Sequence, residues 1–365
     1  MWIGLPFLTF ILLKKPFVTV TVCSPGSTAN CQTIDHVLVD TASSGLRIVA
    51  SVLSPSLALP QQTDGNGHGL AECAVFADGY SWGAVRLADI QLSGETASSV
   101  PIHIVADAAF PATPASCSSR GPVAENTVAG LGANGVLGVG PLAEDCGTAC
   151  AQNAIPGNYY ICTAGVCSPI IASVAQQVQN PVTKLPTDNN GVVIDLPAIP
   201  ASGSATVAGS LIFGIGTQSN NALGGATRFN LDSVGNLVTV FNSQTLKKAF
   251  FDSGSNGLFF PDNAIAVCSA ASIARGFYCP ATSLSLTATV IGANNGNAGN
   301  VSFSVANAVS LASGSPGFTA FNNLAGPFGV PGSFDWGLPF FYGHRIYTAI
   351  EQRNTPAGVG PYIAF

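Results

Sequence analysis

A short polar turn at the end of an apolar strand occurs twice in this chain. This repeat restricts the possible folds more than any other feature of the sequence. The first copy, HVLVDTASSGL, places Asp40 at the end of the strand, and the second, AFFDSGSNGLFF, places Asp252 there. In both copies the aspartate is followed by a hydroxyl residue, a small residue, a serine, a small polar residue and a Gly-Leu pair. The repeat predicts two halves of similar architecture, each of which ends a strand on one carboxylate.

The composition favours a mainly β protein. The chain has 365 residues, 47% hydrophobic and 8% charged, with 41 glycines and 24 prolines. Helices tolerate so much glycine and proline poorly, whereas turns between strands require them. The length suits one large or two medium domains. From the doubled turn we expect an N-terminal lobe over residues 16–216, with the first aspartate, and a C-terminal lobe over residues 217–365, with the second.

Several segments read as strands from their alternating or β-branched apolar residues. These are residues 17–23, 35–40, 71–95 (two strands that form a hairpin around Asp78-Gly79), 100–107, 132–140, 191–197, 209–218, 246–252, 303–311 and 345–351. Residues 168–180 give the best helical pattern, with Ser168 as the N-cap, Pro169 in the first turn and apolar residues on one face. A second, short helix is expected over residues 261–270.

Charge and cysteine content narrow the functional class. The net charge is −6 and the 12 basic residues are scattered, so nucleic-acid binding is not expected. Ten cysteines predict disulfides and an exported protein, periplasmic, cell-surface or secreted. The pairing expected from proximity is Cys23 with Cys31, Cys146 with Cys150, Cys162 with Cys167 and Cys268 with Cys279, which leaves Cys73 with Cys117. A zinc site of Cys146, Cys150, Cys162 and Cys167 is the alternative, although its spacing departs from the usual C-x2-C pairs.

The first 13 residues, MWIGLPFLTFILL, are apolar and are followed by two lysines. This run is short for a membrane span of about 20 residues. A signal peptide has positive charge before the apolar run and small residues after it, and neither is present here. Residues 1–15 are therefore interpreted as a poor signal, an anchor or a misassigned start, and membrane contact is expected only if residues 1–13 act as an anchor.

The two aspartates suggest a specific chemistry. Two carboxyl groups within hydrogen-bonding distance share one proton, so that one is ionised and the other is protonated. The ionised group can take a proton from a water molecule while the other donates a proton to a substrate carbonyl. We therefore expect Asp40 and Asp252 to form a catalytic pair that hydrolyses an amide with no cofactor and no metal.

The flanking residues fit that role. Thr41 and Ser253 can hydrogen-bond across to the opposite turn, whereas Ser43 and Ser255 can donate to the outer carboxylate oxygens. The alternative is a purely structural role, in which each aspartate only caps its own turn, as is common for aspartate.

These features resemble the pepsin-like aspartic peptidases. The two Asp turns look like that family's Asp-Thr/Ser-Gly-Ser/Thr loops, FADGYSWGAVRLADIQLSG resembles its flap hairpin, and NGVLGVG and FDWGLPFFYG resemble the strands behind the two aspartates. The order is preserved from about Phe17 to Phe365, and the details look like an uncharacterised bacterial exported branch. The resemblance implies a bilobal fold of two pseudo-symmetric β-barrel-like lobes with a central cleft, and a monomeric endopeptidase for extended peptides with an acidic optimum.

The flap resemblance assigns substrate contacts to Phe76, Asp78, Gly79 and Tyr80. Two departures bear on activity: Arg47 stands where the family usually has Trp, and Phe76 where it usually has the flap Tyr. A second hypothesis is therefore a catalytically inactive binding or envelope protein with the same lobes. A third is a structural protein held at the cell surface by residues 1–13.

Overall fold

The computed structural model describes residues 15–163, 165–294, 296–314 and 317–365. The chain is mainly β, with 41% strand and 9% helix, as the composition predicts. Contacts divide it into two compact units, unit 1 with Phe17–Asn189 and unit 2 with Asn190–Phe365. The predicted lobe boundary after residue 216 stays a prediction. The apolar segment 1–13 lies outside the described residues, and no helix among the described residues is long and apolar enough to span a membrane.

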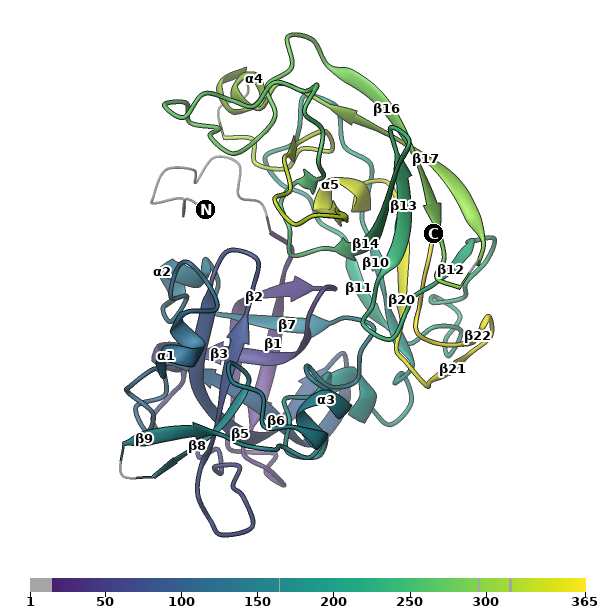
Figure 1. The fold of residues 1–365 in the computed structure, drawn as a ribbon. Helices are drawn as coiled ribbons and strands as arrows, with labels where there is room; N and C mark the ends of the chain where they lie inside the picture. Colours follow the sequence, from purple (N-terminus) through teal and green to yellow (C-terminus); the bar gives the residue numbers. More distant parts are fainter. Residues whose placement is uncertain (1–14, 164, 295, 315–316) are drawn as a thin grey trace. The chain divides into compact units, whose positions relative to one another are not determined.

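Unit 1 is built on a closed six-stranded barrel (Figure 1). The strands pair in the order β1-β2-β7-β3-β6-β5, and β5 pairs again with β1 to close the ring. Their bounds are β1 Phe17–Cys23, β2 Cys31–Asp40, β3 Ser44–Val49, β5 Tyr80–Leu92, β6 Glu95–Val105 and β7 Gly135–Val139. Closure leaves no unpaired edge in the ring.

Three more strands extend the sheet of unit 1 beyond β5. They are β4 Leu70–Val75, β8 Tyr159–Thr163 and β9 Val166–Pro169. Strands β4 and β5 form the hairpin expected around Asp78-Gly79, with Val75 opposite Tyr80. The helices of unit 1 are short: α1 Ala115–Ser118, α2 Val128–Leu131 and α3 Thr148–Gln152, with 3-10 turns η1 Ala50–Val52 and η2 Pro181–Lys184.

Unit 2 contains a curled seven-stranded half-barrel, paired in the order β17-β16-β13-β14-β19-β15-β18. The bounds are β13 Leu237–Phe241, β14 Gln244–Asp252, β15 Leu258–Phe259, β16 Leu284–Ile291, β17 Ala298–Val305, β18 Ala325–Gly326 and β19 Ser333–Gly337. In β16 the polar and apolar residues alternate, and the more buried positions of its C-terminal half follow that alternation.

A second sheet of unit 2 has five strands in the order β11-β10-β20-β23-β12. These are β10 Gly191–Asp195, β11 Ser210–Phe213, β12 Arg228–Asn230, β20 Arg345–Ala349 and β23 Tyr362–Ala364. The remaining elements of unit 2 are the small hairpin of β21 Asn354–Thr355 and β22 Gly358–Val359, with helices α4 Ala308–Gly314 and α5 Leu338–Phe341.

The helix predicted over residues 168–180 is wrong. The disulfide between Cys162 and Cys167 closes the β8–β9 turn, and Pro169 ends β9 opposite Tyr160. The chain beyond β9 is irregular, and Ile171, one residue of the expected apolar face, is 50% exposed. Strand pairing and a covalent link therefore override the helical pattern. The short helix predicted over residues 261–270 is also wrong, because that segment forms turns and a bridge.

The core of unit 2 is aromatic. Phe334 is fully buried, its ring stacks on Phe260 at a centroid distance of 5.0 Å, and it stacks on Trp336 at 4.3 Å. Aromatic pairs of this geometry add to the free energy of area burial. Stacked aromatic rings therefore form a large part of the half-barrel core, beside buried aliphatic residues such as Leu237 and Val290.

Replacing Phe334 by Ala is expected to lower the free energy of unfolding of unit 2 by about 3–5 kcal/mol, because the change leaves a cavity among stacked rings. Guanidinium unfolding followed by tryptophan fluorescence measures the change. Val234→Ala, at a side chain that is 65% exposed, is the control and should change stability by about 0.5 kcal/mol or less. A loss below about 1 kcal/mol for Phe334→Ala would contradict this account of the core.

Candidate functional site: two aspartate turns and a buried ionic cluster

The first aspartate turn holds its carboxylate with local hydrogen bonds. Strand β2 ends at Asp40, which is 7% exposed. The backbone N–H of Ala42 donates to Asp40 Oδ1 at 2.8 Å, and Ser43 Oγ donates to Oδ2 at 2.5 Å. Each oxygen thus has one donor from the turn itself, which fixes the orientation of the carboxylate. Ser43 thus donates to the Asp40 carboxylate, and its predicted role at the outer oxygen of a catalytic pair stays a prediction.

The second turn repeats these bonds atom for atom. Strand β14 ends at Asp252, the N–H of Gly254 donates to Asp252 Oδ1 at 2.7 Å, and Ser255 Oγ donates to Oδ2 at 2.8 Å. The Ser255 N–H adds a third contact to Oδ1 at 3.2 Å. Asp252 is therefore held in the same local geometry as Asp40.

A third strand runs between the two strands joined by the first turn. Strand β7 pairs in parallel with β2 and antiparallel with β3. Asp40 lies opposite Gly138, and Arg47, seven residues after Asp40, lies opposite Val136, two residues before Gly138.

Unit 2 has the same arrangement in the same register. Strand β19 pairs in parallel with β14 and antiparallel with β15. Asp252 lies opposite Gly337, and Phe259, seven residues after Asp252, lies opposite Asp335, two residues before Gly337. The two turns are thus copies in hydrogen bonding, strand direction and register.

Both threaded strands need glycine where they pass the turn. A Cβ on Gly138 would lie 2.8 Å from the backbone carbon of Ser43, and a Cβ on Gly337 would lie 2.0 Å from the carbonyl oxygen of Gly257. Neither backbone atom can move aside easily, because it belongs to the turn. The glycines therefore allow the threaded strand to approach the aspartate turn closely.

Thr41 and Ser253 follow the two aspartates and are buried, at 2% and 0% exposure. Their predicted hydrogen bonds to the opposite turn stay a prediction, as does the pairing of Asp40 with Asp252, because the two aspartates belong to different units.

The tip of the β4–β5 hairpin contains the residues that the sequence assigns to substrate contact. The N–H of Phe76 donates to the Gly79 carbonyl at 2.8 Å, which closes the turn, and Asp78 is exposed. Tyr80 is half-buried, and its N–H donates to the Val123 carbonyl at 2.9 Å. The hairpin tip is thus attached to the segment that precedes α2. Whether these residues contact a substrate stays a prediction.

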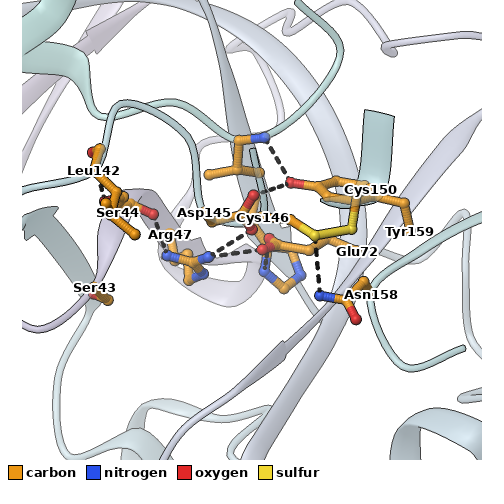
Figure 2. A network of polar contacts seen from close by, with 12 residues as sticks. Ser43, Ser44, Arg47, Glu72, Leu142, Asp145, Cys146, Cys150, Asn158 and Tyr159 are labelled. Carbon is orange, nitrogen blue, oxygen red and sulfur yellow. Dashed lines mark hydrogen bonds and ion pairs between the residues drawn. A yellow bond between two sulfur atoms is a disulfide. The ribbon is translucent and has the colours of Figure 1, made fainter. Parts of the chain in front are cut away.

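Unit 1 also contains a buried cluster of ionisable side chains, which we call the Arg47 cluster (Figure 2). Its members are Arg47, Glu72, His103, Asp145 and Tyr159. Arg47 Nη2 lies 2.7 Å from Glu72 Oε1 and 3.2 Å from Asp145 Oδ2. Arg47 Nη1 donates to the carbonyl oxygen of Ser44, in the Asp40 turn, at 2.9 Å.

The outer members of the cluster complete its contacts. His103 Nδ1 lies 2.8 Å from Glu72 Oε2, and the Tyr159 hydroxyl donates to Asp145 Oδ1 at 2.5 Å. The N–H of Val178 in turn donates to the Tyr159 hydroxyl at 2.8 Å. The side chains of Glu72 and His103 are 1% and 0% exposed. The Asp145 side chain is 13% exposed, so the cluster lies mostly in the interior of unit 1.

Burial and charge shift the pKa values of the two carboxyl groups in opposite directions. Burial would raise the pKa of Glu72, but the charges of Arg47 and His103 outweigh it and hold that pKa well below its usual range. Burial, followed by the negative charge of Glu72 and the hydrogen bond to it, raises the pKa of Asp145. The opposite shifts favour an ionised Glu72 beside a protonated Asp145.

The other two shifts follow from the same neighbours. Burial opposes the charge on Arg47, yet Glu72 and Asp145 hold the pKa of the guanidinium above its usual value. Burial and then the nearby Asp145 raise the pKa of the Tyr159 hydroxyl, which stays a hydrogen-bond donor.

The sequence analysis treated Arg47 only as a departure from a family pattern, and it did not connect His103 with it. It did not identify Glu72, Asp145 or Tyr159. The available signal was a charged residue inside an apolar strand, as in the LAECAV of β4, in a chain with only 8% charged residues.

The predicted disulfide pairing is confirmed. The structure contains Cys23–Cys31, Cys73–Cys117, Cys146–Cys150, Cys162–Cys167 and Cys268–Cys279. The four cysteines of the alternative zinc site are bonded in two pairs, so they are not available as thiolate ligands. Five disulfides indicate an oxidising environment outside the cytoplasm.

Together the fold and the turns define a mainly β protein with two β lobes, each carrying one aspartate turn with a threaded strand. The chain belongs to the family described as "Protein of unknown function (DUF3443)", whose model matches residues 8–365. A search of curated proteins finds no match.

The Arg47 cluster predicts an unusual pH dependence of stability. Because the pKa of Asp145 is raised in the folded state, the folded protein keeps a proton that the unfolded chain releases above about pH 4. The folded state is therefore progressively destabilised as the pH rises towards the folded pKa, by up to about 1.4 kcal/mol per pH unit. Asp145→Asn removes this titration and keeps a donor to Glu72, so the stability of the variant relative to the wild type should increase from pH 5 to pH 7.

Thermal or denaturant unfolding at several pH values tests this prediction. Asp232→Asn is the control, because Asp232 Oδ1 accepts the Val234 and Asn236 N–H groups of its own turn, in unit 2, and the variant should keep the wild-type profile. Parallel stability profiles for Asp145→Asn and the wild type over this pH range would contradict the prediction.

Proposed function

We propose that the chain is an aspartic endopeptidase in which Asp40 and Asp252 act as a pair. The observation that carries the proposal is the duplication of the aspartate turn. In both copies a backbone N–H binds Oδ1, a serine hydroxyl binds Oδ2, and a glycine-containing strand passes behind in the same register. An aspartate that only caps a turn needs no such copy in a second unit. The proposal includes the bilobal arrangement of the pepsin-like peptidases.

In the proposed reaction the two carboxyl groups hold one proton and one water molecule between them. The ionised carboxylate takes a proton from the water, whose oxygen adds to the peptide carbonyl, while the protonated carboxyl group donates to the carbonyl oxygen. The tetrahedral intermediate then loses the amine, which leaves with a proton from the pair. Ser43 and Ser255 orient the carboxylates for these transfers.

The substrate class is an extended peptide. Such a chain presents carbonyl and N–H groups along its length, which suits recognition by main-chain hydrogen bonds beside a β-hairpin. The β4–β5 hairpin supplies an exposed tip at Asp78 and a half-buried aromatic ring at Phe76. In the proposal this hairpin contacts the peptide. The five disulfides support action outside the cytoplasm, on protein or peptide substrates found there.

A second candidate function is peptide binding without hydrolysis. Phe76 has no hydroxyl group, and the guanidinium of Arg47 is committed to the Asp40 turn and to two carboxyl groups. Phe76 therefore cannot make the hydrogen bond by which the family that this chain resembles orders its hairpin over a substrate. A protein that kept both aspartate turns but lost turnover would bind extended peptides and release them intact.

A fluorogenic peptide-library digest between pH 3 and pH 7 tests the proposal. The wild type should cleave peptides with an acidic optimum, because one carboxyl group must be protonated, and a statine-type inhibitor should block cleavage. Asp40→Asn and Asp252→Asn should each lower kcat by about 10²- to 10⁴-fold, the range for loss of general acid–base catalysis.

Two turn-capping aspartates serve as matched controls. Asp64 Oδ1 accepts bonds from the Asn66 and His68 N–H groups, and Asp232 Oδ1 accepts them from the Val234 and Asn236 N–H groups. Asp64→Asn and Asp232→Asn should retain full activity. Cleavage by Asp252→Asn at the wild-type rate would exclude the carboxylate pair. Binding of a statine-type inhibitor or peptide without cleavage would instead favour the second function.

A further inference from the structure

Arg47 is a fixed cation in the interior of unit 1. It is 3% exposed and lies on β3, seven residues after Asp40. Its guanidinium contacts Glu72 on β4 at 2.7 Å, and it donates to the Ser44 carbonyl at 2.9 Å. Because these partners lie on different elements, the guanidinium links the Asp40 turn to the β4–β5 hairpin.

The fold of the threaded strand does not itself require a cation at this place. In unit 2 the residue in the same register is Phe259, a half-buried aromatic side chain. A buried guanidinium must instead be compensated by counter-charge and hydrogen bonds: Glu72 supplies the negative charge in unit 1, and Asp145 Oδ2 is a second polar partner at 3.2 Å. Unit 1 thus has four buried ionisable groups and the partly exposed Asp145 where unit 2 has one apolar side chain.

An aromatic ring lies beside the guanidinium. Arg47 Cζ lies 5.9 Å from the centroid of the Phe76 ring, within the distance at which a cation is attracted to an aromatic face. Phe76 stands at the tip of the hairpin, and its N–H donates to the Gly79 carbonyl at 2.8 Å. This distance is near the outer limit of about 6 Å for such an attraction.

The far side of the tip has its own attachment. The Tyr80 N–H donates to the Val123 carbonyl at 2.9 Å, and the Glu125 N–H donates to the Tyr80 carbonyl at 2.8 Å. The two sides of the tip are thus held by separate contacts. Phe76 contacts Arg47 on the β4 side, and Tyr80 bonds to residues 123–125 on the β5 side. Removing one attachment should loosen the tip without unfolding the barrel.

We propose that Arg47 is a positioning residue: held by Glu72 and the Ser44 carbonyl, it fixes the tip of the β4–β5 hairpin through Phe76 and couples it to the Asp40 turn. The consequence for peptide cleavage rests on the proposed function. The restraint on the hairpin does not rest on the proposed function, so it can be tested even if the protein has no peptidase activity.

Amide hydrogen exchange of the full chain measures the restraint. Phe76→Leu keeps an apolar side chain but removes the aromatic face, and it should lower the protection of the Phe76 amide about two- to five-fold. Phe76→Tyr keeps the ring and should restore wild-type protection. Val75→Ala, at a neighbouring side chain that is 39% exposed, is the matched control and should leave protection unchanged.

A double-mutant cycle assigns the effect to Arg47. Arg47→Met alone would leave Glu72 as an uncompensated buried charge, so it is combined with Glu72→Gln. In that background Phe76→Leu should cause no further loss of protection. If the combined variant does not fold, the Phe76→Leu and Phe76→Tyr pair decides alone: unchanged protection in Phe76→Leu, or no rescue by Tyr, overturns the proposal. The proposal is also overturned if Phe76→Leu lowers amide protection as much in the combined variant as in the wild type.

A kinetic measurement separates this proposal from the proposed function. If the chain cleaves peptides, Phe76→Leu should change KM more than kcat: the factor by which KM rises should be about two to five times the factor by which kcat falls. Phe76→Tyr should reverse the change. If the wild type cleaves nothing while Phe76→Leu still loses amide protection, the peptidase function fails and the positioning role of Arg47 stands.

Discussion

The close passage of a glycine-containing strand behind each aspartate turn is the constraint on which the rest of the structure depends. Gly138 and Gly337 have no side chain to separate the strand from the turn, and the turn closes on its own carboxylate. The strand therefore pairs on both sides, in parallel with the strand before the aspartate and antiparallel with the strand after it. This double pairing holds Asp40 and Asp252 at the ends of rigid strands rather than on loops.

The two units surround the same motif with different interiors. Unit 2 packs stacked aromatic rings around Phe334, whereas unit 1 places the Arg47 cluster beside its turn. An ionic interior is expensive, because every charge must be paired and hydrogen-bonded when water is removed. The cluster meets part of this condition, because the pKa shifts favour an ionised Glu72 beside Arg47 and a protonated Asp145 beside Glu72, whereas among the described residues Arg47 Nε and His103 Nε2 are buried without a hydrogen-bond partner. The ionic solution also gives unit 1 a link between its turn and its hairpin.

Sequence patterns predicted the features that depend on neighbouring residues. The β1 strand, the β4–β5 hairpin, both aspartate turns and four of the disulfides follow from local alternation, turn residues and short cysteine spacing, whereas Cys73–Cys117 was assigned as the remaining pair. The helix expected over residues 168–180 failed because its first residues pair with β8 and a disulfide closes that hairpin. Its helical periodicity was a local preference that non-local pairing outweighed.

By itself the sequence determined a mainly β, disulfide-linked chain with two equivalent aspartate turns, because these features are encoded within short segments. Only the tertiary structure decided that Glu72, His103, Asp145 and Tyr159 meet Arg47, and that Arg47 lies against Phe76. Those side chains come from strands and loops that are far apart along the chain. Their contacts depend on barrel closure and strand register, and no local pattern of residues specifies which charges will share an interior.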